Sequence, residues 1–278
     1  MTPPRTTRVV GDPAFSGIEV KLEPGESLLG GEGRMIFRSG AVETKARTQG
    51  LGRAIARGLA GAGFAINEFS GVAPKGGMVA FAGVAPGGMV EAKVTKTVPL
   101  VMSRNSFVCC DSVVEVGAKF NFRGLFEVGQ EEGFLLPRAA INPSSSAAEG
   151  RIWLSAFGHV QKHNVPAGES FWVDNGCFVA CTVLDPSKPP YKVDTAVNGG
   201  WQAFLSGEGF AMRFEGPITV WTQNRNLNDF SANVARLVGD TPNAAETTGD
   251  VVSGIASLFT GGGSPESKKK KKKSTKKK

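Results

Sequence analysis

Apolar and polar side chains alternate in short stretches along most of this 278-residue chain. Residues 18–22 (Ile-Glu-Val-Lys-Leu) and 212–215 (Met-Arg-Phe-Glu) show the pattern, and Gly, Pro, Asn or Asp residues bound such stretches. A period of two places the apolar side chains on one face of a β-strand, and the bounding residues are those that form turns. The pattern predicts an all-β body over residues 14–226.

Sequence landmarks recur within this region and predict an internal repeat. Gly25-Glu26-Ser27 returns 143 positions later as Gly168-Glu169-Ser170, and residues 106–110 resemble residues 177–181 at an offset of 71. Farther along, each copy reaches a Gly-Phe pair, and these pairs end at Phe64, Phe134 and Phe210. Units that cannot bury an apolar face alone must cover one another. We therefore expect three pseudo-repeated β units that form a prism- or barrel-like body.

After residue 226 the period becomes helical. Four apolar residues share one helical face: Phe230, Val234, Leu237 and Val238. Asp229 is the predicted N-cap of this helix. A second apolar set follows Asp250 and is a candidate membrane or partner docking face: Val251, Val252, Ile255, Leu258 and Phe259. We expect two short amphipathic helices over residues 227–260, followed by a Gly-, Ser- and Lys-rich tail, residues 261–278, that stays disordered.

The positive charge of the chain is concentrated in that tail. Lys and Arg number 32 against 25 Asp and Glu, a net charge of +7. Nine lysines lie within the last eleven positions: Lys268, Lys269, Lys270, Lys271, Lys272, Lys273, Lys276, Lys277 and Lys278. Without those nine the balance is 23 against 25, so the rest of the chain carries about −2. We expect the tail to bind polyanions, either nucleic acid or an anionic lipid surface. The alternative is a solvated tail that aids solubility.

The composition offers few side chains for catalysis. The chain has two histidines and one tyrosine, and it lacks the G-x-S-x-G, G-x-x-x-x-G-K-[ST] and G-x-G-x-x-G motifs. His159 and His163 would share one face of a helix and offer two metal ligands. Pro166 favours a strand or turn there, and hence a surface pair. We expect no catalytic residue, no cofactor and no metal site.

The four cysteines form a second candidate metal site. Cys110 and Cys181 occupy equivalent positions of two units, so they would converge if the units pack around an axis. Arg38 stands at the third equivalent position and leaves the set incomplete. Reduced thiols that pack as small apolar residues are the expected state, with a metal-binding protein as the alternative.

Several landmarks, in their order and spacing, resemble those of one known family. They are Pro24–Ser27, Gly63-Phe64 before Asn67, Gly124–Phe126 leading to Glu132–Phe134, and Ser206–Phe210 leading to Gly216-Pro217 and Trp221. Over residues 14–226 the chain resembles the altered-inheritance-of-mitochondria (number 24) family, whose members occur in bacteria and in mitochondria.

That resemblance implies a fold similar to the β-structure of the tryptophan-attenuation RNA-binding protein, together with homo-oligomers. The mitochondrial members of the family are linked to inner-membrane organisation and are not known as enzymes. The resemblance supplies no set of catalytic residues.

Targeting signals are sparse. The longest apolar run is far shorter than the roughly 20 residues that a membrane span needs, and residues 1–8 lack the apolar stretch of a secretory signal. Two arginines and three threonines in that segment are typical of a transit peptide, but its two prolines oppose an amphipathic helix. We expect a cytoplasmic protein, with a mitochondrial location as the alternative.

These features together predict a non-enzymatic, oligomeric scaffold or interaction protein that acts at a membrane surface through its basic tail. Its protein partner is not identified by the sequence. The first alternative is an RNA-binding protein, for which Arg151 beside Trp153, and Trp221 near Arg225, would supply cations and stacking rings. The second alternative is the metal-binding protein considered above.

Overall fold

A computed structural model describes residues 6–47, 66–117, 136–185, 188–194 and 211–239. The first two ranges hold these strands: β1 (Thr7–Val10), β2 (Gly17–Leu22), β3 (Ser27–Gly31), β4 (Met35–Arg38), β5 (Val42–Ala46), β6 (Ile66–Gly71), β7 (Gly77–Ala82), β8 (Met89–Thr95), β9 (Leu100–Met102), β10 (Phe107–Asp111) and β11 (Val114–Gly117).

The remaining ranges hold eight strands and two helical elements. The strands are β12 (Arg138–Ile141), β13 (Glu149–Ser155), β14 (Val160–Val165), β15 (Ser170–Asp174), β16 (Phe178–Thr182), β17 (Lys192–Asp194), β18 (Ala211–Glu215) and β19 (Ile218–Gln223). The helical elements are the 3-10 helix η2 (Asn175–Cys177) and the α-helix α3 (Leu227–Gly239).

The strands form four sheets in which neighbouring strands are antiparallel. Their orders are β1-β2-β7-β4, β5-β6-β3-β10-β13-β8, β11-β12-β9-β16-β19-β14 and β15-β18-β17. The alternation seen in the sequence has its expected effect in β2, where Ile18, Val20 and Leu22 are buried while Lys21 is exposed. The predicted all-β body is therefore confirmed.

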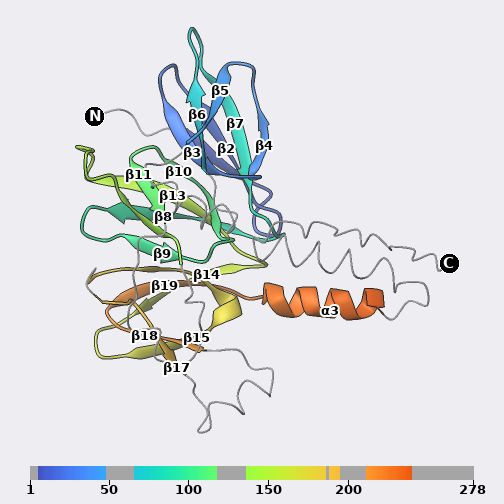
Figure 1. Ribbon diagram of the computed structural model, residues 1–278, viewed down its shortest axis with the longest axis vertical. Coiled ribbons are helices and arrows are strands. Elements are labelled where there is room, and N and C mark those ends of the chain that lie inside the picture. The colour runs from blue at the N-terminus through green and yellow to red at the C-terminus, as the bar shows by residue number, and fades with distance from the viewer. Residues whose placement is uncertain (1–5, 48–65, 118–135, 186–187, 195–210, 240–278) are drawn as a thin grey trace, which may run out of the picture.

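All strands except β1 belong to three groups of six, which are stacked along the long axis of the molecule (Figure 1). The first group is β2–β7, the second is β8–β13 and the third is β14–β19. The first group lies at the top of Figure 1 and the third at the bottom, while α3 projects to one side. Two ladders join successive groups, because β3 pairs with β10 and β9 pairs with β16.

Each group contains a ladder with the same irregularity. β4 pairs with β7, β10 with β13 and β16 with β19, and each ladder shifts register next to the first residue of the earlier strand. Such a shift is the mark of a β-bulge, which adds one residue to one strand and locally increases its twist. The bulge residues are Ile36, Val108 and Val179.

Apolar side chains form three cores, and each core crosses a boundary between groups. The first core combines residues of β2, β3, β5, β6 and β7 with Val108, Cys109 and Trp153 of the second group. The second core likewise includes Val179, Ala180 and Trp221 of the third group. The third core is built on residues of β14, β15, β16, β18 and β19 and of the segments beside β16, with Val101 and Leu136 of the second group. The groups therefore depend on one another for burial of apolar surface.

The helix α3 confirms the first predicted helix but not its predicted cap. It begins at Leu227, and the backbone N–H of Asp229 donates to Oδ1 of Asn226 at 3.4 Å. Asn226 is thus the N-cap, and Asp229 lies in the first turn, where a negative charge is favourable. The predicted Asp229 cap is wrong because Asn226 is held in place by the body, through a bond from its Nδ2 to Asp174 Oδ1 at 3.2 Å.

The remaining predictions about the fold are either not confirmed or concern residues outside the described ranges. The sheets do not close into a barrel among the described residues, so the predicted barrel-like closure is not confirmed. The Gly-Phe landmarks, the second predicted helix and the tail lie outside the described residues. Within the described ranges, no helix has both the length and the apolar character needed to span a membrane.

Candidate functional site

The candidate site consists of two outer sheet edges at opposite ends of the stack. We call residues 35–38 the β4 edge and residues 170–174 the β15 edge. β4 is the last strand of the first sheet and β15 is an outer strand of the fourth. An outer strand presents backbone N–H and C=O groups to which another strand can be added.

The β4 edge is apolar and exposed. Met35, Ile36 and Phe37 have exposed fractions of 43%, 56% and 46%. The bulge at Ile36 breaks the alternation that would otherwise turn every second side chain inward. Arg38 ends the strand, and its Nη1 donates to the carbonyl oxygen of Val42. Clustered large apolar side chains on a surface mark an interaction site.

The β15 edge carries an exposed tryptophan beside a cation. Trp172 is 49% exposed, and the guanidinium carbon of Arg213 lies 5.2 Å from the centre of its ring. Glu215 holds that guanidinium in place at 2.8 Å. Ser170 donates to Glu215 at 2.7 Å and accepts from Arg213 Nη2 at 3.1 Å. The edge therefore presents an apolar ring whose charged neighbour is already neutralised.

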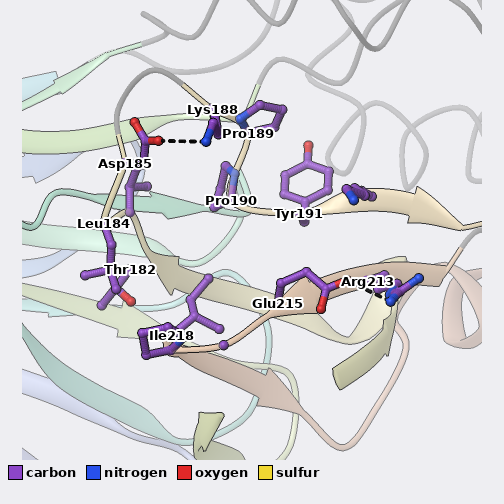
Figure 2. A pocket seen from close by; sticks show the side chains of 14 residues that line it. Thr182, Leu184, Asp185, Lys188, Pro189, Pro190, Tyr191, Arg213, Glu215 and Ile218 are labelled. Atoms are coloured by element: carbon purple, nitrogen blue, oxygen red, sulfur yellow. Dashed lines mark ion pairs between the residues drawn. The ribbon is translucent and has the colours of Figure 1, made fainter. Parts of the chain in front are cut away.

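A pocket of about 440 Å³ opens in the third group, where Asp185, Lys188, Pro189 and Pro190 form part of its wall. Figure 2 shows an ion pair in each of two parts of its wall, Lys188 with Asp185 at 3.5 Å and Arg213 with Glu215 at 2.8 Å. Tyr191 contributes to the wall, and burial raises the pKa of its hydroxyl group, with the Cys181 thiol as a smaller cause. The pocket is large enough for a small ligand, but the described residues of its lining include no histidine or cysteine to act as a base or nucleophile.

The cysteines do not converge. Cys109, Cys110 and Cys181 are buried in three different cores, and Cys177 is half-buried. Burial raises the pKa of the Cys181 thiol, which keeps it protonated and unreactive. Burial, followed by the charges of Asp174 and Asp229, also raises the pKa of Cys177. The expected packing role of these thiols fits this arrangement.

The histidines lie on or beside a strand, as Pro166 indicated. His163 belongs to β14, where its Nε2 bonds to Thr222 Oγ1 at 2.9 Å and its ring lies 4.8 Å from that of Phe171. His159 precedes the same strand and is exposed. No cluster of three His, Cys, Asp or Glu side chains suited to a metal ion occurs in the part of the chain that the structure describes.

The two rings that the RNA-binding hypothesis assigned to stacking are both buried. Trp153 is only 1% exposed and Trp221 only 5% exposed, so neither ring presents a face on which a base could stack. The guanidinium carbon of Arg151 lies 5.0 Å from the centre of the Trp153 ring, so this pair packs within the body and does not form a binding surface. That part of the RNA-binding hypothesis is wrong.

The residues predicted to bind polyanions and to dock on a membrane or partner lie outside the described residues. They are Lys268–Lys273, Lys276–Lys278 and the apolar set at residues 251–259. The two sheet edges and the pocket were not predicted as sites. The run Met35-Ile36-Phe37 was a usable signal for the β4 edge, because three large apolar residues in succession exceed what a half-buried strand needs.

Comparison with known proteins identifies the family. The model of the family described as mitochondrial biogenesis AIM24 matches residues 7–225. The chain belongs to the mitochondrial biogenesis AIM24 family. This membership confirms the family inferred from the landmarks, and the family's link to mitochondrial biogenesis fits the mitochondrial alternative for location.

The fold of this AIM24-family chain is similar to that of a protein whose crystal structure has been solved. That protein is SPYM3_0169 from Streptococcus pyogenes, and its X-ray crystal structure matches with a TM-score of 0.64 and 22% sequence identity. The similarity covers 84% of this chain and 99% of that chain. At this identity the likeness shows the fold alone. No curated protein matches this chain.

Proposed function

We propose that this AIM24-family protein is a non-enzymatic, oligomeric scaffold that is presented at an anionic membrane surface by its polybasic tail. The observation that carries the proposal is the serial construction of the body. Three groups of strands are joined by equivalent ladders, and apolar edges are left at both ends. A body built in this way offers surface for partners and little for chemistry.

In this proposal the three groups are structural repeats. Phe37 faces Ala80 in the first group, just as Cys109 faces Trp153 in the second and Ala180 faces Trp221 in the third: the ladders match position by position. The ladders also share the adjacent bulge. This correspondence supports the three-unit hypothesis drawn from the sequence landmarks, and it supplies the order of units on which a scaffold depends.

The non-enzymatic part of the proposal is supported by the state of the candidate nucleophiles. The Cys181 thiol is buried with a raised pKa, and His163, which could serve as a base, is engaged by Thr222 and Phe171. An activated nucleophile needs a base within hydrogen-bonding reach. The ring nitrogen Nε2 of His163 is instead bonded to the hydroxyl group of Thr222.

The membrane part of the proposal rests on charge. Nine lysines lie within the last eleven residues, whereas the rest of the chain carries a net charge of about −2, so the net positive charge is concentrated in that segment. Near an anionic surface each lysine contributes about 1 kcal/mol. A basic segment combined with an apolar helix face anchors more firmly than either alone, and the apolar set at residues 251–259 would supply that face. A cytoplasmic location with reversible membrane contact stays our prediction.

Co-sedimentation with liposomes tests this function. We expect the full chain to bind vesicles containing anionic lipid and not neutral vesicles, with binding that weakens as salt rises. A 1–249 truncation should lose binding because it lacks the apolar set and all nine lysines of the tail. Equal binding of the full chain and the truncation, or no binding to anionic vesicles, contradicts the membrane role.

An RNA-binding protein is the second candidate, with a fold like that of the tryptophan-attenuation RNA-binding protein. The observation that favours it is the exposed ring of Trp172 beside Arg213, since bases stack on such rings. An RNA competitor in the same experiment separates the two functions. RNA affinity that survives truncation to 1–249 and falls in Trp172→Ala would favour the RNA-binding body.

A further inference from the structure

We propose that a second copy of this chain docks head to tail, so that the β15 edge of one copy forms a ladder with the β4 edge of the next. This inference deepens the proposed scaffold function and rests on the three-unit construction. It names the occupant of both edges as the chain itself.

Two junctions of the required kind already exist inside the chain. β3 of the first group pairs with β10 of the second so that Leu29 faces Cys110. β9 of the second group pairs with β16 of the third so that Val101 faces Cys181. Both junctions are antiparallel, and both join the second strand of one group to the third strand of the next, which carries the bulge.

The same positions can be located on the two outer edges. Arg38 faces Val79 in its ladder, just as Cys110 faces Ile152 and Cys181 faces Val220. Arg38 is therefore the β4-edge counterpart of the two junction cysteines.

The counterpart on the β15 edge is Trp172. Trp172 faces Arg213 on β18. In the preceding groups Leu29 faces Glu68 and Val101 faces Arg138 at the corresponding ladder positions. A third junction in the same register would set Trp172 of one copy opposite Arg38 of the next, a cation–aromatic pair.

Ile36 and Trp172 on the two outer edges are exposed, whereas the residues at the equivalent positions of the two internal junctions are buried. Ile36 is 56% exposed, whereas its counterparts Val108 and Val179 are 0% exposed. Trp172 is 49% exposed, whereas its counterparts Leu29 and Val101 are 0% exposed. Both edges therefore expose large apolar side chains at positions where a strand that stays in contact with solvent would favour polar ones.

The composition of the three cores also indicates that a second copy of the chain covers the β15 edge. Val108 and Cys109 complete the core of the first group, and Val179 and Ala180 complete that of the second. The third core receives no such contribution from a following group among the described residues. Ile36 and Phe37 of a second copy are the residues that correspond to these contributions.

The two edges differ and lie in different groups, β4 in the first and β15 in the third (Figure 1). The contact is therefore heterologous, with unlike surfaces on the two partners. Heterologous contacts generate closed rings when the rotation between copies closes and open filaments when it does not.

Sedimentation velocity of the full chain with two edge variants tests this proposal. The wild-type chain should sediment as oligomers, either rings of fixed size or filaments that grow with concentration. Ile36→Glu and Trp172→Glu should each be monomeric, because each has one charged edge. Mixing the two variants should give a species of two copies and no larger, since one intact β15 edge meets one intact β4 edge.

The controls separate assembly from folding. Ile36 and Trp172 are exposed, so both variants should keep the circular dichroism and melting temperature of the monomer. Val84→Glu, which charges an apolar residue 40% exposed outside both edges, should assemble like the wild type. A wild-type chain that is monomeric at all concentrations overturns the proposal. So does a single edge variant that still dimerises, because that result requires like edges to meet.

Cross-linking tests the register. In a Cys177→Ser background, Arg38→Cys combined with Trp172→Cys should form disulfide-linked oligomers under mild oxidation, whereas Arg38→Cys combined with Phe171→Cys should not. Equal cross-linking of both pairs overturns the register. The liposome experiment is independent of this one. Monomeric edge variants that still bind anionic vesicles leave the membrane role standing, and assembly without vesicle binding refutes only that role.

Discussion

Gly30 shows how little space the first core leaves around its backbone. A Cβ atom at this position would lie 2.5 Å from Phe81 Cε1 and 2.8 Å from Phe69 Cε2. Those two rings form an edge-to-face pair with centres 5.0 Å apart, an arrangement that aromatic quadrupoles favour. The strand β3 can therefore pass beneath the rings only with glycine at this point.

Gly30→Val should destabilise the protein by about 1–3 kcal/mol, the usual result of overpacking a core. The added side chain must displace both rings, and their edge-to-face contact is lost. Chemical denaturation measures the free energy of unfolding. Gly40→Ala, where an added Cβ meets nothing within 4 Å, is the matched control and should change it little. Equal effects of the two substitutions would mean that the core around Gly30 can relax.

At the scale of elements, α3 depends on a cap that also ties it to the body. Asn226 accepts from the N–H of Asp229 and donates to Asp174, which in turn accepts from the N–H of Gly176 in η2. Phe230 of the helix lies 5.1 Å from Phe157, ring centre to ring centre. These contacts fix where the helix begins and the direction in which it leaves the last strand.

Asn226→Ala should lower the stability of α3 by about 1 kcal/mol, the typical effect of losing an N-cap. Amide hydrogen exchange should accelerate in residues 227–239 more than in β19. Asn233→Ala, an exposed change within the same helix, is the control and should leave exchange unchanged or slower. Unchanged exchange in Asn226→Ala would mean that packing, and not the cap, holds the helix.

Sequence patterns predicted the type of these elements better than their ends and contacts. Period alone identified strands such as β2 and the helix after residue 226, because it reports which faces are apolar. It could not choose between Asn226 and Asp229 as the cap, since both side chains are competent and the choice is made by Asp174, 52 positions away. It also could not predict the rotation between groups: the expected prism- or barrel-like body is not confirmed, and the described sheets do not close into a barrel.

For the whole molecule, interleaved cores make the groups thermodynamically inseparable. Trp153 stands on β13 of the second group but is buried in the core of the first. Its guanidinium neighbour Arg151 is bonded to Asp111 at 3.2 Å, which fixes the ladder that carries both residues. Because one side chain serves two groups, we expect the described body to unfold in one cooperative step.

Trp153→Ala should cost about 3–5 kcal/mol of stability, and hydrogen exchange should rise together in the first and second groups. The cavity would open at their boundary, so neither group would be spared. Loss of protection in the second group alone would contradict the shared core. Phe15→Ala, a large but 75% exposed aromatic residue, controls for the loss of ring volume.

Folding must choose between β10 and β16 as the partner of β3, because both strands offer that edge in the same register with the same bulge. Choosing β16 would roughly double the loop that is closed, which disfavours it by only about 0.6 kcal/mol. The entropy of loop closure therefore favours the correct pairing of β3 with β10 only slightly. During synthesis the N-terminal part of a chain emerges and begins to fold first, and β10 is available to β3 before β16 has been made. We therefore expect the order in which the strands are synthesised to help specify which of them pair.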